Sequence, residues 1–167
     1  MENKNKVRQV TKVCDTCEFC GVPRINCICN RVSRINTKAQ IWILSSQKEV
    51  TRPTNTARLI KLVNEGSTEI FIWERKIPPA KLIELIEGGE FELYLLFPVD
   101  EENKHREKTF EKTDKKAAFI IIDGTWQEAK KIFNRSPYLK SLPLLTLNIE
   151  KESQFKQIGR ASCRERV

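Results

Sequence analysis

The sequence predicts an α/β fold, in which a mostly parallel sheet is flanked by helices and a small cysteine-rich module precedes the sheet. Three observations support this prediction. Short apolar runs alternate with amphipathic segments along the chain. The clearest run, residues 117–122, ends at Asp123-Gly124 and leads directly into a helical pattern. Five cysteines fall between Cys14 and Cys29, before the first apolar run.

Five strands and three helices are expected in order along the chain. Each strand is a short apolar run that is rich in β-branched or aromatic residues. The helices have recognisable boundaries: Thr54, Asn55 and Thr56 are possible N-caps of the first, and Pro-Pro and Gly-Gly pairs bracket the second. The expected elements are strand 39–44, helix 57–64, strand 68–73, helix 80–87, strand 92–97, strand 117–122, the helix that begins near Trp126, and strand 144–148.

Residues 99–116 are predicted to form an exposed and mobile loop because charged side chains dominate them. The loop carries the chain's single histidine, His105. A lone histidine in a charged run is typical of a solvated side chain rather than of a site.

The cysteine-rich segment, residues 14–30, is typical of a metal site. The pairs Cys17-x-x-Cys20 and Cys27-x-Cys29 supply four thiolates on two tight turns, which suits tetrahedral zinc. Cys14 could replace Cys17, and an iron–sulfur cluster is a weaker alternative. Since a four-cysteine zinc site has no open position for chemistry, a structural staple is favoured over an RNA-binding knuckle.

The composition favours a polyanionic partner. The chain of 167 residues has a formal net charge of +8, so nucleic acid is a better candidate than a membrane surface. No apolar run reaches the ~20 residues of a membrane span, and the polar residues 1–13 resemble a disordered lead rather than a secretion signal. We therefore expect a cytoplasmic protein of one main domain, with no obligate protein partner evident.

Asp123 is the main candidate for a functional residue. It should lie at the carboxyl end of a central strand and beside a helix N-terminus, where α/β sheets bind ligands. With Thr125, Trp126 and the cations of the following helix, it could hold a nucleobase and its phosphates. The structural alternatives are a helix N-cap for Asp123 and core packing for Trp126.

Several motifs in order resemble the DTW-domain family, over about residues 14–157. They are Cys17-x-x-Cys20-x-x-Pro23-x-x-x-Cys27-x-Cys29, Thr54-Asn-Thr-Ala-Arg-Leu59, Leu95-Leu-Phe-Pro98, Asp123-Gly-Thr-Trp126 and the segment from Gln127 to Pro143. The resemblance implies a SPOUT-like α/β domain whose C-terminal knot forms the cofactor pocket. It also implies a tRNA-uridine aminocarboxypropyltransferase. Such enzymes transfer the 3-amino-3-carboxypropyl group of S-adenosyl-L-methionine to N3 of a uridine and release methylthioadenosine.

On this resemblance, Asp123 becomes the candidate general base for the N3 proton. The expected catalytic residues are Asp123, Thr125 and Trp126, and the expected cofactor-binding residues are Glu49, Arg52, Thr56, Arg58 and Gly124. The expected RNA-binding residues are Lys130, Lys131 and Arg135, and the expected ligands of a structural zinc ion are Cys17, Cys20, Cys27 and Cys29.

Two departures from the family pattern are present. Where relatives commonly have His-Pro-x-Glu, this chain has Ser46-Gln-Lys-Glu49, so any role of that histidine is missing here. Residues 158–167 read as the translation of a short-read sequencing adapter, and the family's downstream segments are absent. We therefore expect residues 31–157 to be a truncated catalytic domain with an incomplete knot, and the chain as given to be poorly stable and inactive.

Two other functions remain open on the sequence alone. An S-adenosylmethionine-dependent RNA methyltransferase would use the same cofactor and the same class of substrate. A non-catalytic, zinc-bearing RNA-binding protein would explain the positive charge and the cysteines without any chemistry at Asp123.

Overall fold

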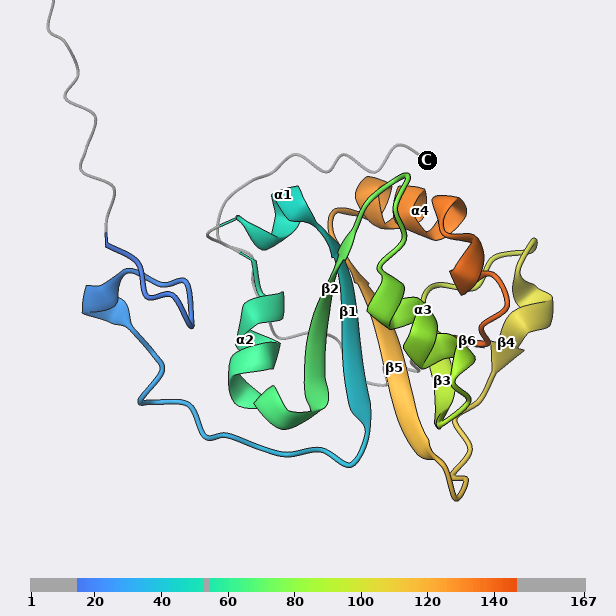
Figure 1. Ribbon diagram of the computed structural model, residues 1–167, viewed down its shortest axis with the longest axis horizontal. Helices are drawn as coiled ribbons and strands as arrows, with labels where there is room; N and C mark the ends of the chain where they lie inside the picture. The colour runs from blue at the N-terminus through green and yellow to red at the C-terminus, as the bar shows by residue number, and fades with distance from the viewer. Residues whose placement is uncertain (1–14, 53–54, 147–167) are drawn as a thin grey trace, which may run out of the picture.

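The computed structural model describes residues 15–52 and 55–146 (Figure 1). The expected basic lead, Cys14, the C-terminal knot and the adapter-like tail lie outside the described residues. The sheet consists of β1 (Gln40–Ser46), β2 (Thr68–Trp73), β3 (Phe91–Leu96), β4 (Glu107–Lys108), β5 (Lys116–Asp123) and β6 (Leu144–Leu145). The strand order is β2-β1-β5-β3-β6-β4, and every neighbouring pair is parallel.

Four α-helices and four short 3₁₀ turns connect the strands. The α-helices are α1 (Gln47–Val50), α2 (Ala57–Val63), α3 (Ala80–Glu87) and α4 (Trp126–Arg135). The 3₁₀ turns are η1 (Arg24–Asn26), η2 (Glu65–Ser67), η3 (Lys104–Arg106) and η4 (Pro137–Leu139). The predicted fold class, a parallel α/β sheet flanked by helices and preceded by a cysteine cluster, is therefore confirmed.

Alternation along the strands places the main core on one face of the sheet. Trp42 and Leu44 of β1 and Ala118 and Ile120 of β5 are buried there, together with Leu82 of α3. The buried face of α4 packs into the same cluster through Ala129 and Ile132. This arrangement fixes α4 against the carboxyl end of β5, where Asp123 lies.

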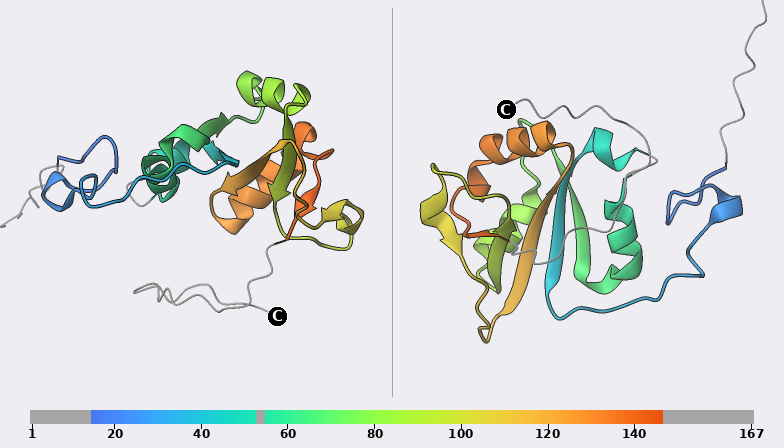
Figure 2. Two further views of the ribbon diagram at one scale, coloured as in Figure 1. Left: turned by 90° about the horizontal axis from the view of Figure 1, so that it is seen from below. Right: turned by 180° about the vertical axis from the view of Figure 1, so that it is seen from behind.

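The carboxyl ends of the central strands meet at one edge of the sheet (Figures 1 and 2). There α1 follows β1 and α4 follows β5, so that both helices lie together at the top of Figure 1. Register pairing places Ser45 of β1 beside Asp123 of β5. Residues that are far apart in the sequence therefore share this edge, which is the usual place for a ligand in an α/β sheet.

The prediction of an exposed loop over residues 99–116 is wrong for part of its length. η3 and β4 lie within it, and β4 pairs with β6 through Glu107 and Leu144. Arg106 donates hydrogen bonds from Nη2 to the carbonyl oxygens of Leu139 and Leu142, at 2.6 and 2.7 Å. These bonds to a distant turn order the segment despite its charge.

The described part of the chain contains no helix with the length and apolar character that crossing a membrane requires.

Candidate functional site

Asp123 is held at the end of β5 by two buried donors. Its Oδ2 accepts hydrogen bonds from Ser45 Oγ at 3.0 Å and from Asn55 Nδ2 at 2.7 Å. Ser45 is fully buried and Asn55 is 5% exposed, so both donors are fixed by their surroundings. Among the described residues no hydrogen bond reaches Oδ1. The carboxylate is thus positioned through one oxygen and has the other available.

Thr125, rather than Asp123, is the N-cap of α4. Its Oγ1 accepts a hydrogen bond from the Glu128 N–H at 3.4 Å. The Glu128 carboxylate in turn accepts from the Thr125 N–H at 3.0 Å and the Thr125 hydroxyl at 2.7 Å. This reciprocal arrangement is a capping box. It rules out the N-cap alternative for Asp123. Thr125 therefore stabilises the N-terminus of α4 at the predicted site.

We expect Thr125→Ala to lower the free energy of unfolding by about 1 kcal/mol at neutral pH, because α4 loses its cap. The hydrogen bonds from the Thr125 hydroxyl and N–H hold the pKa of Glu128 below its ordinary value of 4.5. A depressed carboxyl pKa stabilises the fold above the unfolded value, and this stabilisation is lost as pH falls through the folded value. Urea unfolding should therefore show that the difference in free energy of unfolding between Thr125→Ala and the unchanged protein becomes smaller below pH 4.5.

Thr113→Ala is the matched control, since Thr113 is exposed on the segment before β5. A Thr125→Ala protein as stable as this control at neutral pH would show that the capping box contributes nothing.

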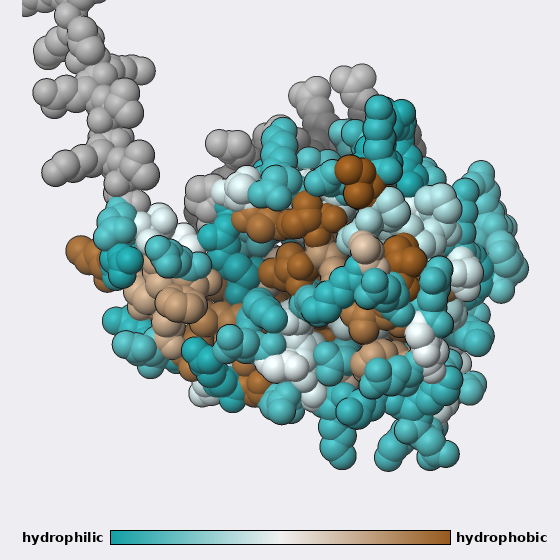
Figure 3. Space-filling view, viewed as in Figure 1, coloured by the Kyte–Doolittle hydropathy of each residue, from teal (hydrophilic) through white to brown (hydrophobic). Residues whose placement is uncertain are grey.

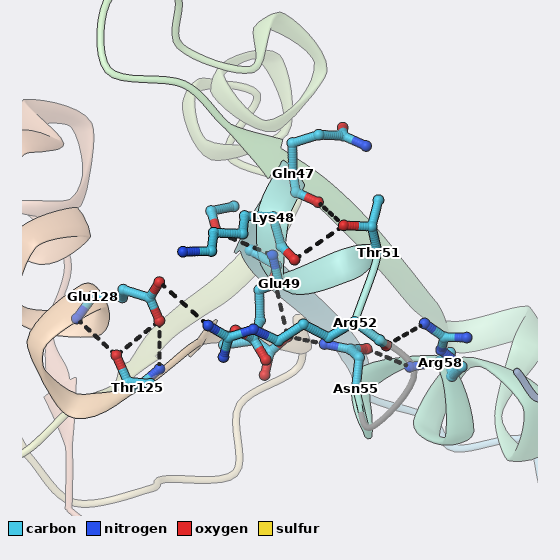
Figure 4. A network of polar contacts seen from close by, with 12 residues as sticks. Gln47, Lys48, Glu49, Thr51, Arg52, Asn55, Arg58, Thr125 and Glu128 are labelled. Carbon is cyan, nitrogen blue, oxygen red and sulfur yellow. Dashed lines mark hydrogen bonds and ion pairs between the residues drawn. The ribbon is translucent and has the colours of Figure 1, made fainter. Parts of the chain in front are cut away.

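Glu49 and Arg52 lie across the same edge from α4 (Figure 4). Arg52 Nη1 is 2.5 Å from Glu49 Oε2, and Arg52 Nη2 is 3.9 Å from Glu128 Oε1. Glu49 is 9% exposed and Arg52 is half-buried, so the closer pair is only partly screened by solvent. The structure therefore places two of the predicted cofactor-binding residues at the same edge of the sheet as Asp123, paired with each other.

Arg58, which is predicted to bind the cofactor, contacts backbone groups in the structure. Its Nη2 donates to the carbonyl oxygens of Val50 and Arg52, at 2.9 and 2.7 Å (Figure 4). Its guanidinium also lies against the backbone of Gly21, where an added Cβ would be 1.7 Å from Nη1. Arg58 thus fastens the segment after α1 to the cysteine-rich turn. Thr56 precedes α2, is exposed and makes no side-chain capping bond.

Trp126 faces a separate, aromatic part of the edge. It is 58% exposed, so the core-packing alternative is wrong, and its ring stacks on Phe97 with centroids 5.6 Å apart. Phe97 stacks in turn on Phe133 at 4.1 Å, and the Arg106 guanidinium lies 5.4 Å from the Phe133 centroid. A cavity of about 830 Å³ opens beside this stack, a volume suited to a cofactor or nucleoside.

Charged side chains surround the cavity. Lys130 and Lys140 line it from α4 and the turn that follows, and His105 and Arg106 line it from η3. The remaining lining includes Asp100, Glu101 and Glu102. Of the predicted RNA-binding residues, only Lys130 reaches this cavity. Lys131 and Arg135 are exposed elsewhere on α4, four positions apart and therefore on one face of the helix.

Several residues of the site were not predicted from the sequence. Ser45, Asn55, Phe97 and Arg106 all contribute contacts described above. Three signals were present in the sequence: Phe97 belongs to the Leu95–Pro98 motif, Asn55 belongs to the Thr54–Leu59 motif, and Thr125-x-x-Glu128 is the pattern of a capping box. Ser45 carries no such signal, because only the strand register brings it to Asp123.

The four predicted zinc ligands form a second site at the N-terminus. The Sγ atoms of Cys17, Cys20, Cys27 and Cys29 all lie within 4.8 Å of one another. The Cys17–Cys29 and Cys20–Cys27 sulfur distances are 3.7 and 3.8 Å. Four thiolates at a zinc–sulfur distance of about 2.3 Å would stand roughly 3.8 Å apart in a tetrahedron. The cluster could therefore hold a metal ion, and its geometry fits zinc.

The electrostatics of the cluster also suit thiolate ligands. Hydrogen bonds from the backbone of Ile28 and Val22 lower the pKa of Cys20 to about 6, and those from Cys20 and Phe19 lower the pKa of Cys17. Burial, followed by the neighbouring thiols, raises the pKa of Cys29 to about 12. The lowered pKa values of Cys17 and Cys20 favour their thiolate forms, which are the forms that bind a metal ion.

The cluster packs against the α/β unit. Cys17 and Cys20 are buried with Leu62 of α2, and Leu59 lies against the same group. Gly21 provides the turn between the two cysteine pairs at φ 69°, a left-handed conformation that favours glycine.

The family model described as "DTW domain" matches residues 14–167. No solved structure matches the chain.

Proposed function

The chain belongs to the DTW-domain family, and from this membership we propose that it transfers the 3-amino-3-carboxypropyl group of S-adenosylmethionine to N3 of a uridine in tRNA. The family is consistent with a tRNA-modifying enzyme. The specific reaction is our inference from the site, and the observation that carries it is the arrangement around Asp123.

Asp123 suits the proton transfer that this reaction requires. Uridine N3 bears a weakly acidic proton and becomes nucleophilic only when that proton is removed. Ser45 and Asn55 fix the Asp123 carboxylate through Oδ2. Oδ1, to which none of the described residues donates, can accept the N3 proton as a general base. The N3–carbon bond then forms as the carbon–sulfur bond breaks, and methylthioadenosine leaves with the bonding electron pair. Asp123 passes its proton to water.

S-adenosylmethionine supplies an alkyl carbon activated by a positively charged sulfur. The aromatic cavity fits the chemistry of such a donor, because the exposed ring of Trp126 offers a flat face for a nucleobase and Asp100 offers a carboxylate for cationic groups. Glu49 and Arg52 remain candidates for its amino-acid portion. Arg58 we now assign to positioning the Val50–Arg52 backbone, since its guanidinium is already engaged there.

We also propose that the cysteine cluster binds one structural zinc ion and that residues 158–167 are not native. Experiments on catalysis should therefore use the chain completed with the C-terminus found at its own genomic locus, alongside the chain as given.

Product analysis tests the proposed reaction. Incubation with tRNA and S-adenosylmethionine should yield methylthioadenosine and a uridine whose mass has risen by one aminocarboxypropyl group. S-adenosylhomocysteine and a methylated base would instead identify a methyltransferase. Retention of tRNA without either product would identify a binding protein, and both of these results would overturn the proposal.

A further inference from the structure

A small groove lies between the cysteine-rich segment and the α/β unit, away from the aromatic cavity. Its volume is about 260 Å³. Leu62 of α2 and Ile70 of β2 contribute apolar surface to it. The other lining residues are Phe19, Arg34, Arg58, Lys61 and Glu65. Sites for whole cofactors occupy about 300–1,000 Å³, so this groove suits a single base rather than a cofactor.

Phe19 gives the groove an exposed aromatic face. The side chain is 73% exposed, although the cysteines at positions 17 and 20 on the same turn are buried. The turn is closed by hydrogen bonds from the Cys17 N–H to the Val22 carbonyl and from the Gly21 N–H to the Cys17 carbonyl, at 2.9 and 2.8 Å. A rigid turn thus presents an aromatic ring to solvent, as a preorganised stacking surface does.

Hydrophobic residues reach the surface of this segment among hydrophilic ones, as the left side of Figure 3 shows. In the groove itself the charged residues are mainly cations: Arg34, Arg58 and Lys61 line it beside one carboxylate, that of Glu65. Lys61 Nζ also donates to the carbonyl oxygens of Glu65 and Thr68. The Arg34–Glu65 pair, at 2.7 Å, has both side chains more than 60% exposed, so it is weak and open to exchange. The groove therefore carries an excess positive charge beside an aromatic face.

We infer that this groove binds an unpaired nucleotide of the RNA substrate, with the base on Phe19 and the phosphates near Arg34 and Lys61. Aromatic faces stack on any base, and cations beside them follow the backbone. The identity of that RNA as tRNA rests on the proposed function. The inference that the groove binds single-stranded RNA is independent of the proposed function.

Arg58 connects this groove to the catalytic edge. It lines the groove and also donates to the Val50 and Arg52 carbonyls, beside the Arg52–Glu128 pair. RNA held on Phe19 would therefore lie beside α2, and Asn55, just before α2, donates a hydrogen bond to Asp123. The groove would orient the substrate while taking no part in the chemistry.

Fluorescence anisotropy with a labelled single-stranded RNA tests the stacking contact. Phe19→Ala should weaken binding about 5- to 150-fold, the loss of one base–aromatic stack. Phe19→Trp should retain the affinity, because it keeps an aromatic face. Ile77→Ala is the matched control, since Ile77 is 67% exposed on the loop after β2. Each variant should keep its metal content, which shows that the turn is folded.

The charged contact is tested by the salt dependence of the same binding. Lys61→Ala should reduce the slope of log affinity against log salt by about 0.7–1, whereas Lys112→Ala, on the exposed segment before β5, should not. Equal RNA affinity of Phe19→Ala and the Ile77→Ala control would overturn the inference. So would equally tight binding of a poly-glutamate peptide, which would make the groove a general anion site. Neither result depends on whether transfer is observed.

Discussion

Replacing Asp123 by asparagine should slow aminocarboxypropyl transfer by about 10²- to 10⁴-fold, the usual contribution of a general base. The asparagine side chain has the same shape and keeps one oxygen to accept hydrogen bonds from Ser45 and Asn55. Folding and tRNA affinity should therefore change little. Single-turnover measurement of methylthioadenosine release at saturating tRNA would isolate the chemical step from binding.

Asp114→Asn is the control for this experiment, because it removes the same charge from an exposed residue that precedes β5. It should transfer at the unchanged rate. If Asp123→Asn keeps its rate within a few-fold of this control, Asp123 is not the base, and the carboxylate serves only to hold Ser45 of β1 and Asn55 before α2 in place.

Loss of the proposed zinc ion should have the largest effect on stability. Structural zinc binding is worth about 10–16 kcal/mol in small zinc-dependent domains. Cys20→Ser, or removal of zinc by a chelator, should therefore unfold the segment around residues 15–30, where the buried apolar cluster consists only of Cys17, Cys20 and Leu62 with partly buried neighbours. The sheet has its own core and should remain folded.

Metal analysis and hydrogen exchange would measure this effect. One zinc per chain is expected in the unchanged protein, and rapid exchange confined to the cysteine-rich segment is expected after its removal. Cys14→Ser is the matched control and should retain the metal, because Cys17 completes the cluster. A Cys14→Ser protein without zinc would reassign that ligand, and unchanged exchange in Cys20→Ser would show that the cluster has no structural role.

The sequence predicted those parts of the fold that local chemistry decides. The bounds of β2 and α3 match the expected residues 68–73 and 80–87, because proline and glycine pairs and apolar runs mark them locally. β4 was not predicted, because the segment is held in place by hydrogen bonds from Arg106 to carbonyl oxygens more than thirty residues away. Charge content along the chain says nothing about such partners.

For the candidate site too, the sequence predicted what local patterns decide and missed what depends on distant residues. The end of an apolar run identified Asp123 at the edge of the sheet, and α/β topology explains why. Its two donors come from Ser45 and Asn55, 78 and 68 residues away, and depend on how β1 and β5 pair. The position of Arg58 was also beyond sequence reasoning, because an arginine beside a catalytic motif has the same appearance whether it contacts a ligand or the backbone.

The contact between Arg58 and Gly21 bears on how this protein can change in evolution. A side chain at position 21 would occupy the space of the Arg58 guanidinium, which would then lose its bonds to the Val50 and Arg52 carbonyls. The two positions are therefore a matched pair. A metal-binding turn from another protein, even one with the same ligand spacing, can be grafted here only if it leaves that space empty, so the turn and α2 must be inherited together.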